Sequence, residues 1–164
     1  MKAWRRLIVL GFIITITQIS CNKLTPAGFW KSYKKQLIVI KESDQGLWGG
    51  YRKIVWENDI TDTFEKKDAI DYSYKNGWHV TDSLIIKNDS IVSLTDYNDK
   101  GYSCKILRRE IMSLLEAKHI YQVYVFKTGW VAVEPGNATE TEKNGFILIN
   151  ENGTKLIMYH LWGE

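Results

Sequence analysis

The sequence predicts a mainly β fold, a single antiparallel meander that forms a barrel or a sandwich and carries one short helix. Three observations predict this class. Short runs of β-branched and aromatic residues recur along the chain, and turn-forming residues separate most of them. Aromatic residues make up 13% of the chain and only two prolines occur, which favours an ordered domain. A single segment, near residues 107–118, has helical spacing instead.

From Gly28 onward the sequence is dominated by expected strands, of which the last ends at Trp162. In order, they are FWKSY, QLIVIK, YRKIVWE, AIDYSY, WHVTDSLIIK, SIVSLTDY, YSCKIL, IYQVYVF, WVAVE, GFILIN and TKLIMYHLW. Their number and short spacing are typical of a meander in a sandwich or barrel.

Turn chemistry predicts how some of these strands pair. The stretch 75–77, Lys-Asn-Gly, predicts a three-residue hairpin loop that places Tyr72 opposite Val80 and Tyr74 opposite Trp78. The dipeptides at 88–89 (Asn-Asp) and 152–153 (Asn-Gly) predict two further tight hairpins.

The expected helix lies at 107–118, where Leu107, Ile111, Leu114 and Leu115 recur at helical spacing. Lys118 stands at its end, where a positive charge suits the helix dipole. We expect this helix to close one end or flank of the sheet.

The first twenty residues have the three-part build of an export signal. Lys2, Arg5 and Arg6 precede an apolar core of about ten residues, and the more polar TQIS follows it. A core of this length falls short of the roughly twenty residues that a membrane-spanning helix needs. Residues 1–20 are therefore expected to be removed as a signal peptide.

The end of this signal, with Ser20 followed by Cys21, resembles the lipobox of bacterial lipoproteins; Gln18 stands where that family usually has Leu, Val or Ile. The resemblance implies that Cys21 is lipidated and that the protein is anchored to a membrane of the bacterial cell envelope, facing the periplasm or the surface. Residues 21–27 then form the lipidated cysteine and a tether, and residues 28–164 form one domain. A conventionally cleaved secreted protein and an uncleaved amino-terminal anchor are the alternatives.

Removal of the signal also changes the charge of the chain. The whole chain has 22 basic and 19 acidic residues, and the signal holds three of the basic ones, so 19 of each remain. From this balance, a basic surface that attracts nucleic acid or anionic lipid is not expected. A lipid on Cys21 would leave Cys104, the second of two cysteines, as a lone thiol that we expect to be a buried apolar residue.

No cluster of residues predicts catalysis, a metal or a cofactor. His79, His119 and His160 are isolated, and no HExxH, CxxC, calcium-loop or phosphate-loop motif is present. Cys104 lies in the middle of an expected strand, where no neighbouring residue would activate it. We expect His160 to be a residue of the core or its rim, and we expect no enzyme.

Two short stretches resemble lipocalins: Gly28-Phe29-Trp30 is similar to the G-x-W signature of their first strand, and Thr95-Asp96-Tyr97 to their T-D-Y turn. Some bacterial lipocalins are also lipid-anchored. The resemblance implies an eight-stranded barrel that holds a small apolar ligand, with Trp30 packed at its closed end.

Six tryptophans remain after the signal, and such aromatics build a core, line a cavity or serve as recognition residues. We therefore expect an exported binding lipoprotein. One version holds a small apolar ligand in an interior lined by Tyr72, Trp78 and Val80. The alternative is an inhibitor or immunity type of lipoprotein that binds another protein through an exposed aromatic patch of Trp48, Tyr51 and Trp56.

Overall fold

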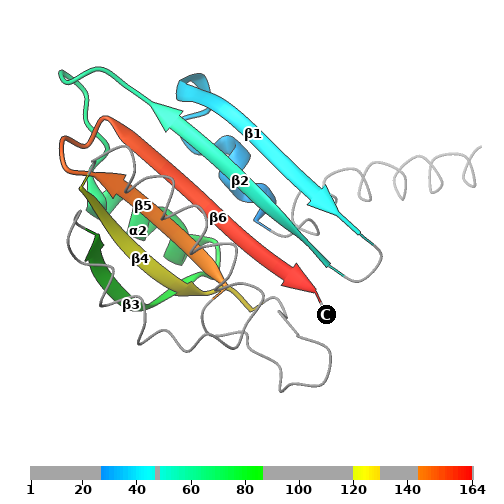
Figure 1. The fold of residues 1–164 in the computed structure, drawn as a ribbon. Coiled ribbons are helices and arrows are strands. Elements are labelled where there is room, and N and C mark those ends of the chain that lie inside the picture. The colour runs from blue at the N-terminus through cyan, green and yellow to red at the C-terminus, as the bar shows by residue number, and fades with distance from the viewer. Residues whose placement is uncertain (1–26, 47–48, 87–119, 130–143, 164) are drawn as a thin grey trace, which may run out of the picture.

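The computed structural model describes residues 27–46, 49–86, 120–129 and 144–163. Six strands form one antiparallel sheet. They are β1 (Ile38–Gln45), β2 (Gly49–Glu57), β3 (His79–Ile86), β4 (Tyr121–Lys127), β5 (Gly145–Asn150) and β6 (Lys155–Gly163). Their order across the sheet is β1-β2-β6-β5-β4-β3. The last strand, β6, therefore lies in the middle of the sheet, between β2 and β5 (Figure 1).

This architecture confirms the mainly β class but not a barrel. Within the described residues β1 and β3 are the two edges of the sheet, and the sheet does not close on itself. The eight-stranded barrel that the lipocalin resemblance implies is therefore not confirmed. Trp30 does lie in the core, where it has no exposed surface, but it belongs to a short 3-10 helix and not to a first strand.

Three helical elements lie on one face of the sheet, which we call the first face. They are the 3-10 helices η1 (Gly28–Ser32) and η2 (Lys35–Leu37) and the α-helix α2 (Lys66–Lys75), which passes behind the sheet in Figure 1. Within the described ranges, no helix is long and apolar enough to cross a membrane.

The sheet is buried on both faces, because each central strand contributes alternate side chains to two hydrophobic clusters. In β2, Ile54 and Trp56 face the helices, whereas Val55 lies in the cluster on the second face. This two-sided burial explains why β5 reads GFILIN, an almost continuous apolar run with no polar alternation.

The hairpin predicted around residues 75–77 is wrong, because residues 66–75 form α2 and not a strand. The Asn-Gly pair ends the helix: the N–H of Trp78 donates to the carbonyl of Ser73 (3.0 Å), and that of Gly77 to Tyr74 (3.0 Å). These two bonds form a Schellman motif, with Gly77 in the left-handed region at φ +84°. The same dipeptide thus suits a helix end as well as a hairpin loop.

Other expected elements have different outcomes. The hairpin at Asn152-Gly153 is confirmed: it joins β5 to β6, and Gly153 has φ +67°. The stretch FWKSY, expected as a strand, is largely the 3-10 helix η1. The helix expected at 107–118 and the hairpin at 88–89 lie outside the described residues.

Candidate functional site

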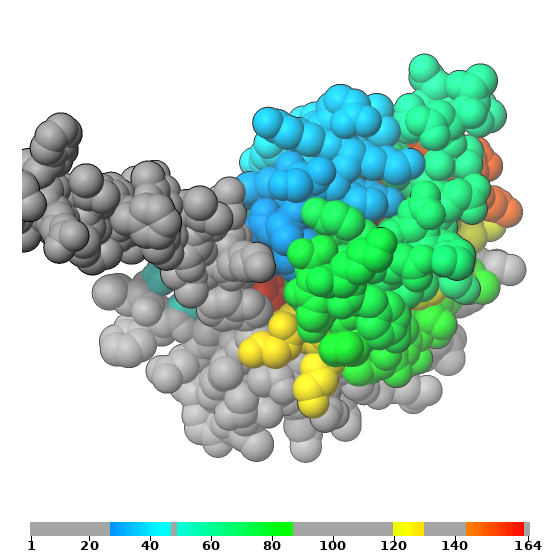
Figure 2. Space-filling model, turned by 180° about the vertical axis from the view of Figure 1, so that it is seen from behind, coloured from blue at the N-terminus to red at the C-terminus, as the bar shows by residue number. Residues whose placement is uncertain are grey.

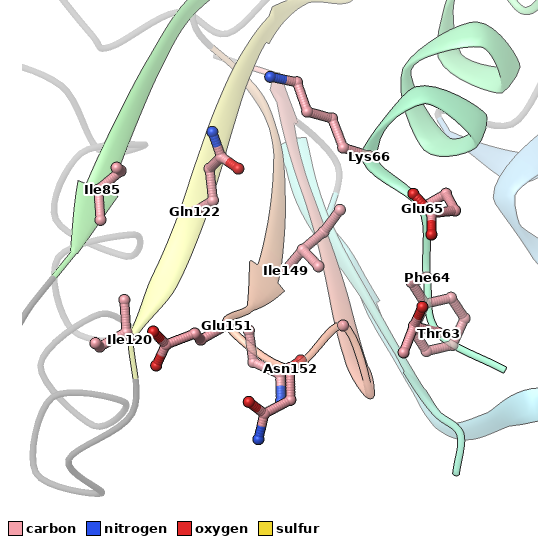
Figure 3. A pocket seen from close by; sticks show the side chains of 12 residues that line it. Thr63, Phe64, Glu65, Lys66, Ile85, Ile120, Gln122, Ile149, Glu151 and Asn152 are labelled. Atoms are coloured by element: carbon pink, nitrogen blue, oxygen red, sulfur yellow. The ribbon is translucent and has the colours of Figure 1, made fainter. Parts of the chain in front are cut away.

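A cleft opens on the first face of the sheet, between the start of α2 and the ends of β3, β4 and β5 (Figure 3). Its volume is about 520 Å³, which lies in the range of pockets that hold small molecules. Its lining comes from four separate parts of the chain: Thr63, Phe64, Glu65, Lys66, Ile85, Ile120, Gln122, Ile149, Asn150, Glu151, Asn152 and Gly153.

One wall of the cleft is the segment that leads into α2. The N–H of Phe64 donates to the carbonyl of Gly153 (2.6 Å), so this wall is fixed to the turn between β5 and β6. The ring of Phe64 is buried in the first-face core. Glu65 and Lys66 follow at the surface and form the rim on this side, as Figure 3 shows.

The floor of the cleft is formed by three neighbouring strands. Gln122 of β4 lies opposite Ile85 of β3 on one side and opposite Ile149 of β5 on the other. Directly opposed residues of antiparallel strands point to the same face of a sheet, so these three side chains form one row. Ile85 is 51% exposed because α2 does not extend over this edge of the sheet.

Some polar groups of the cleft form hydrogen bonds within the protein. The Oδ1 of Asn150 accepts from the N–H of Lys155 (2.8 Å), and its Nδ2 donates to Thr154 Oγ1 (3.0 Å). The ammonium of Lys66 lies 5.2 Å from the centre of the Tyr124 ring. Figure 3 shows carboxylates on both sides, from Glu65 and Glu151.

These groups define what the cleft can bind. Its isoleucines offer an apolar surface, and the amide of Gln122 offers both donors and an acceptor beside them. The two carboxylates on the rim accept hydrogen bonds and outnumber the ammonium of Lys66. The cleft therefore suits a small molecule with an apolar part and hydrogen-bond donors, neutral or positively charged.

The three residues predicted to line a ligand cavity are brought together, but Trp78 lies inside packed core and Tyr72 and Val80 pack against that core. Trp78 is 1% exposed and contacts Phe126 and Phe29, with ring centres 5.6 and 5.5 Å away. Tyr72 donates from its hydroxyl to the carbonyl of Phe29 (2.8 Å), and Val80 packs at the edge of the same cluster. Side chains of the protein thus occupy the space around Trp78 that a ligand was expected to fill.

The predicted aromatic patch is not supported by the residues that the structure describes. Trp56 has no exposed surface and donates from its indole N–H to the carbonyl of Tyr33 (2.8 Å). Tyr51 packs against the cluster on the second face, because residues 51 and 56 of one strand point to opposite sides of the sheet. Trp48 lies outside the described residues.

His160 is a core residue, as expected, and belongs to a buried polar network at the end of the sheet opposite the cleft. Its Nε2 lies 3.1 Å from Thr128 Oγ1, which in turn lies 2.7 Å from Asn144 Oδ1. The Asn144 amide donates from Nδ2 to the carbonyl of Leu161 (3.0 Å). All members of the chain Asn144, Thr128 and His160 are buried.

The network fixes the proton positions from one end to the other. Because Asn144 donates from Nδ2 to a carbonyl, its Oδ1 must accept, and the single proton of the Thr128 hydroxyl points to it. His160 must then donate from Nε2, which leaves Nδ1 as the unprotonated nitrogen. Burial, together with the charge of Arg52, lowers the pKa of His160 to about 3, so the ring is neutral.

The remaining predicted sites lie elsewhere. Cys21, the predicted lipidation site, and Cys104 are outside the described residues. Within the described ranges, no group of three or more His, Cys, Asp or Glu side chains is placed to hold a metal ion.

The sequence did not predict the cleft, because its lining residues come from four separated segments and share no motif. One signal was present: Gln122 is the polar residue in the run IYQVYVF, which is otherwise a buried strand. Comparison with known proteins adds no relative, since no protein-family model, no curated protein and no solved structure matches this chain.

Proposed function

We propose that this protein is an exported lipoprotein of the bacterial cell envelope that binds a small molecule in the cleft beside α2. The cleft is the single observation that carries the binding function. It combines a volume of about 520 Å³ with a floor where two isoleucines flank Gln122 and with polar groups at its rim. The export signal and Cys21 supply the location, as the lipobox resemblance implies.

The proposed ligand site lies at the surface of the domain and not in its interior. The cleft is supported indirectly by Tyr72, Trp78 and Val80. These residues hold α2 against the sheet, and the start of α2 forms one wall of the cleft. The ligand is accordingly less apolar than a molecule enclosed in a barrel would be, since about half of the groups that line the cleft are polar.

A thermal-shift screen tests this proposal with two variants of one residue. A ligand that binds only the folded protein raises the free energy of unfolding, by about 2.7 kcal/mol at a concentration of a hundred times Kd, and so raises the melting temperature. Gln122→Trp fills the floor of the cleft and should abolish the shift, whereas Gln122→Met keeps the volume and should retain most of it. A ligand whose shift survives Gln122→Trp binds elsewhere and contradicts the proposal.

A further inference from the structure

The charges of the proposed mature chain are divided unequally along its length. Residues 21–41 hold five lysines and no acidic residue, and Glu42 is the first acidic residue of the chain. The balance of 19 basic and 19 acidic residues therefore leaves 14 basic against 19 acidic residues after position 41. A chain without net charge thus has a positive amino-terminal part and a negative remainder.

The structure brings four of these lysines to one surface. Lys31, Lys34 and Lys35 lie on and between η1 and η2, and Lys41 lies on β1 opposite Ile54, which faces the same helices. Figure 2 shows η1, η2 and the start of β1, in blue, as an exposed corner beside the green residues of α2. We call Lys31, Lys34, Lys35 and Lys41 the basic surface.

Two members of the basic surface, Lys31 and Lys41, are close enough for their charges to interact. The charge of Arg52, partial burial and the charge of Lys41 all lower the pKa of Lys31. Lys31, Lys35 and Lys41 are exposed, whereas Lys34 is half-buried with its ammonium 5.2 Å from the centre of the Phe64 ring. The approach of an anionic surface is therefore favourable, because opposite charge lowers the electrostatic free energy of these lysines.

The basic surface also lies beside the point where the chain enters the fold. Ala27, the first residue of the described range, is buried, and its carbonyl accepts from the N–H of Trp30 (3.3 Å). Ala27 is six positions after Cys21, and a fully extended chain of this length spans at most about 20 Å. A lipid on Cys21 would therefore hold the basic surface close to the headgroups of the membrane.

We propose that the basic surface of Lys31, Lys34, Lys35 and Lys41 binds anionic lipid headgroups and so orients the domain on the membrane to which Cys21 is attached. This inference rests on the lipid attachment in the proposed function. The covalent lipid supplies the attachment, and the lysines decide which side of the domain faces the bilayer. The acidic remainder of the chain is repelled by the same headgroups and turns away from them.

Vesicle binding tests the basic surface without the lipid. The mature chain with Cys21→Ser is mixed with phosphatidylcholine vesicles, with and without phosphatidylglycerol, and the bound fraction is measured by sedimentation. We expect binding that requires phosphatidylglycerol and weakens as salt is added, because each lysine near such a surface contributes about a fivefold gain in partitioning. Binding that is equal on both kinds of vesicle would overturn the proposal.

Two triple variants distinguish the effect of the basic surface from the effect of the net charge of the chain. Lys31→Gln, Lys35→Gln and Lys41→Gln together should lower the partition coefficient about a hundredfold. The matched control changes Lys67, Lys75 and Lys127 to Gln, which removes the same charge from exposed positions outside the basic surface and should lower it less than about tenfold. Equal losses in the two triples would contradict the proposal, provided that circular dichroism shows both to be folded.

The mass of the protein from its native envelope separates this inference from the proposed function. A lipid mass on Cys21 with vesicle binding that does not depend on phosphatidylglycerol overturns the basic surface alone. An unlipidated Cys21 with phosphatidylglycerol-dependent binding overturns the anchor alone, and the surface then acts as a reversible membrane contact.

Discussion

Replacing Thr128 by valine should destabilise the fold through the buried polar network, although the two side chains have nearly the same shape. Thr128 accepts from His160 Nε2 and donates to Asn144 Oδ1, and all three residues are buried. A valine side chain at this position would remove the hydroxyl to which His160 Nε2 donates and from which Asn144 Oδ1 accepts. Loss of a buried hydrogen-bond partner costs each of the two groups about 1–3 kcal/mol, so the expected loss of unfolding free energy is about 2–6 kcal/mol.

Urea denaturation of the Thr128→Val and Thr128→Ser variants measures this loss. Serine keeps the hydroxyl and removes one methyl group, which should cost about 1 kcal/mol. The network account therefore predicts that the valine variant is clearly less stable than the serine variant. A valine variant within about 0.5 kcal/mol of the wild type, or a serine variant that loses as much as the valine variant, would refute the reasoning, because packing and not hydrogen bonding would then dominate at this position.

Three further predictions follow from particular residues. The free energy of unfolding should fall as the pH drops below about 6.5, by about 3 kcal/mol at pH 4, because His160 binds a proton in the unfolded chain but not in the folded chain, where its pKa is about 3. Urea midpoints at pH 7 and pH 4 check this, and a His160→Phe variant should lack the part of the fall that His160 causes. Gly77→Ala should cost about 1–2 kcal/mol by the same assay, because the helix end needs φ +84° although space for a methyl group exists; no loss would argue against the Schellman motif. Gly145→Ala should cost about 1–3 kcal/mol and change the near-UV circular dichroism, since its Cβ would lie 2.6 Å from Thr128 Cγ2 and 2.8 Å from Trp78 Cζ3; an unchanged spectrum and stability would show that these neighbours move freely.

Most of the strands could be predicted from the sequence, because β propensity and turn residues agree along them. The run YRKIVWE is within β2, and GFILIN is β5 itself, with a turn at Asn152-Gly153. The pairing of the strands was harder to predict. β2 pairs with β6, which lies about a hundred residues later in the chain, and no local sequence signal marks such a contact.

The stretch 66–77 shows why a local pattern was misread. Ile70, Tyr72 and Tyr74 alternate as in a strand, but the segment folds as a helix that buries Ala69 and Ser73, four residues apart. The hydroxyl of Ser73 donates to the carbonyl of Ala69 (2.7 Å) and so belongs to the helix. Contacts with the sheet, which the local sequence does not encode, decide between the two patterns.

The candidate site was harder to predict than the fold. Of the aromatic residues chosen from the sequence, Trp56 and Trp78 lie in one packed core cluster, and Tyr72 packs against it. Core packing and ligand binding draw on the same residue types, so composition could not separate them. The cleft depends instead on where α2 begins, at Lys66, and that helix was not predicted.

The most direct test of the proposed binding function is methyl NMR of residues 21–164, labelled at isoleucine and titrated with a small-molecule extract of bacterial cell envelopes. Ile85, Ile120 and Ile149 line the cleft, whereas Ile54 and Ile147 lie in the core and Ile60 is an exposed residue outside the cleft. The account predicts saturable shift changes at the three cleft methyl groups, with little change at the other three. No saturable change, or changes confined to the core and to Ile60, would contradict it.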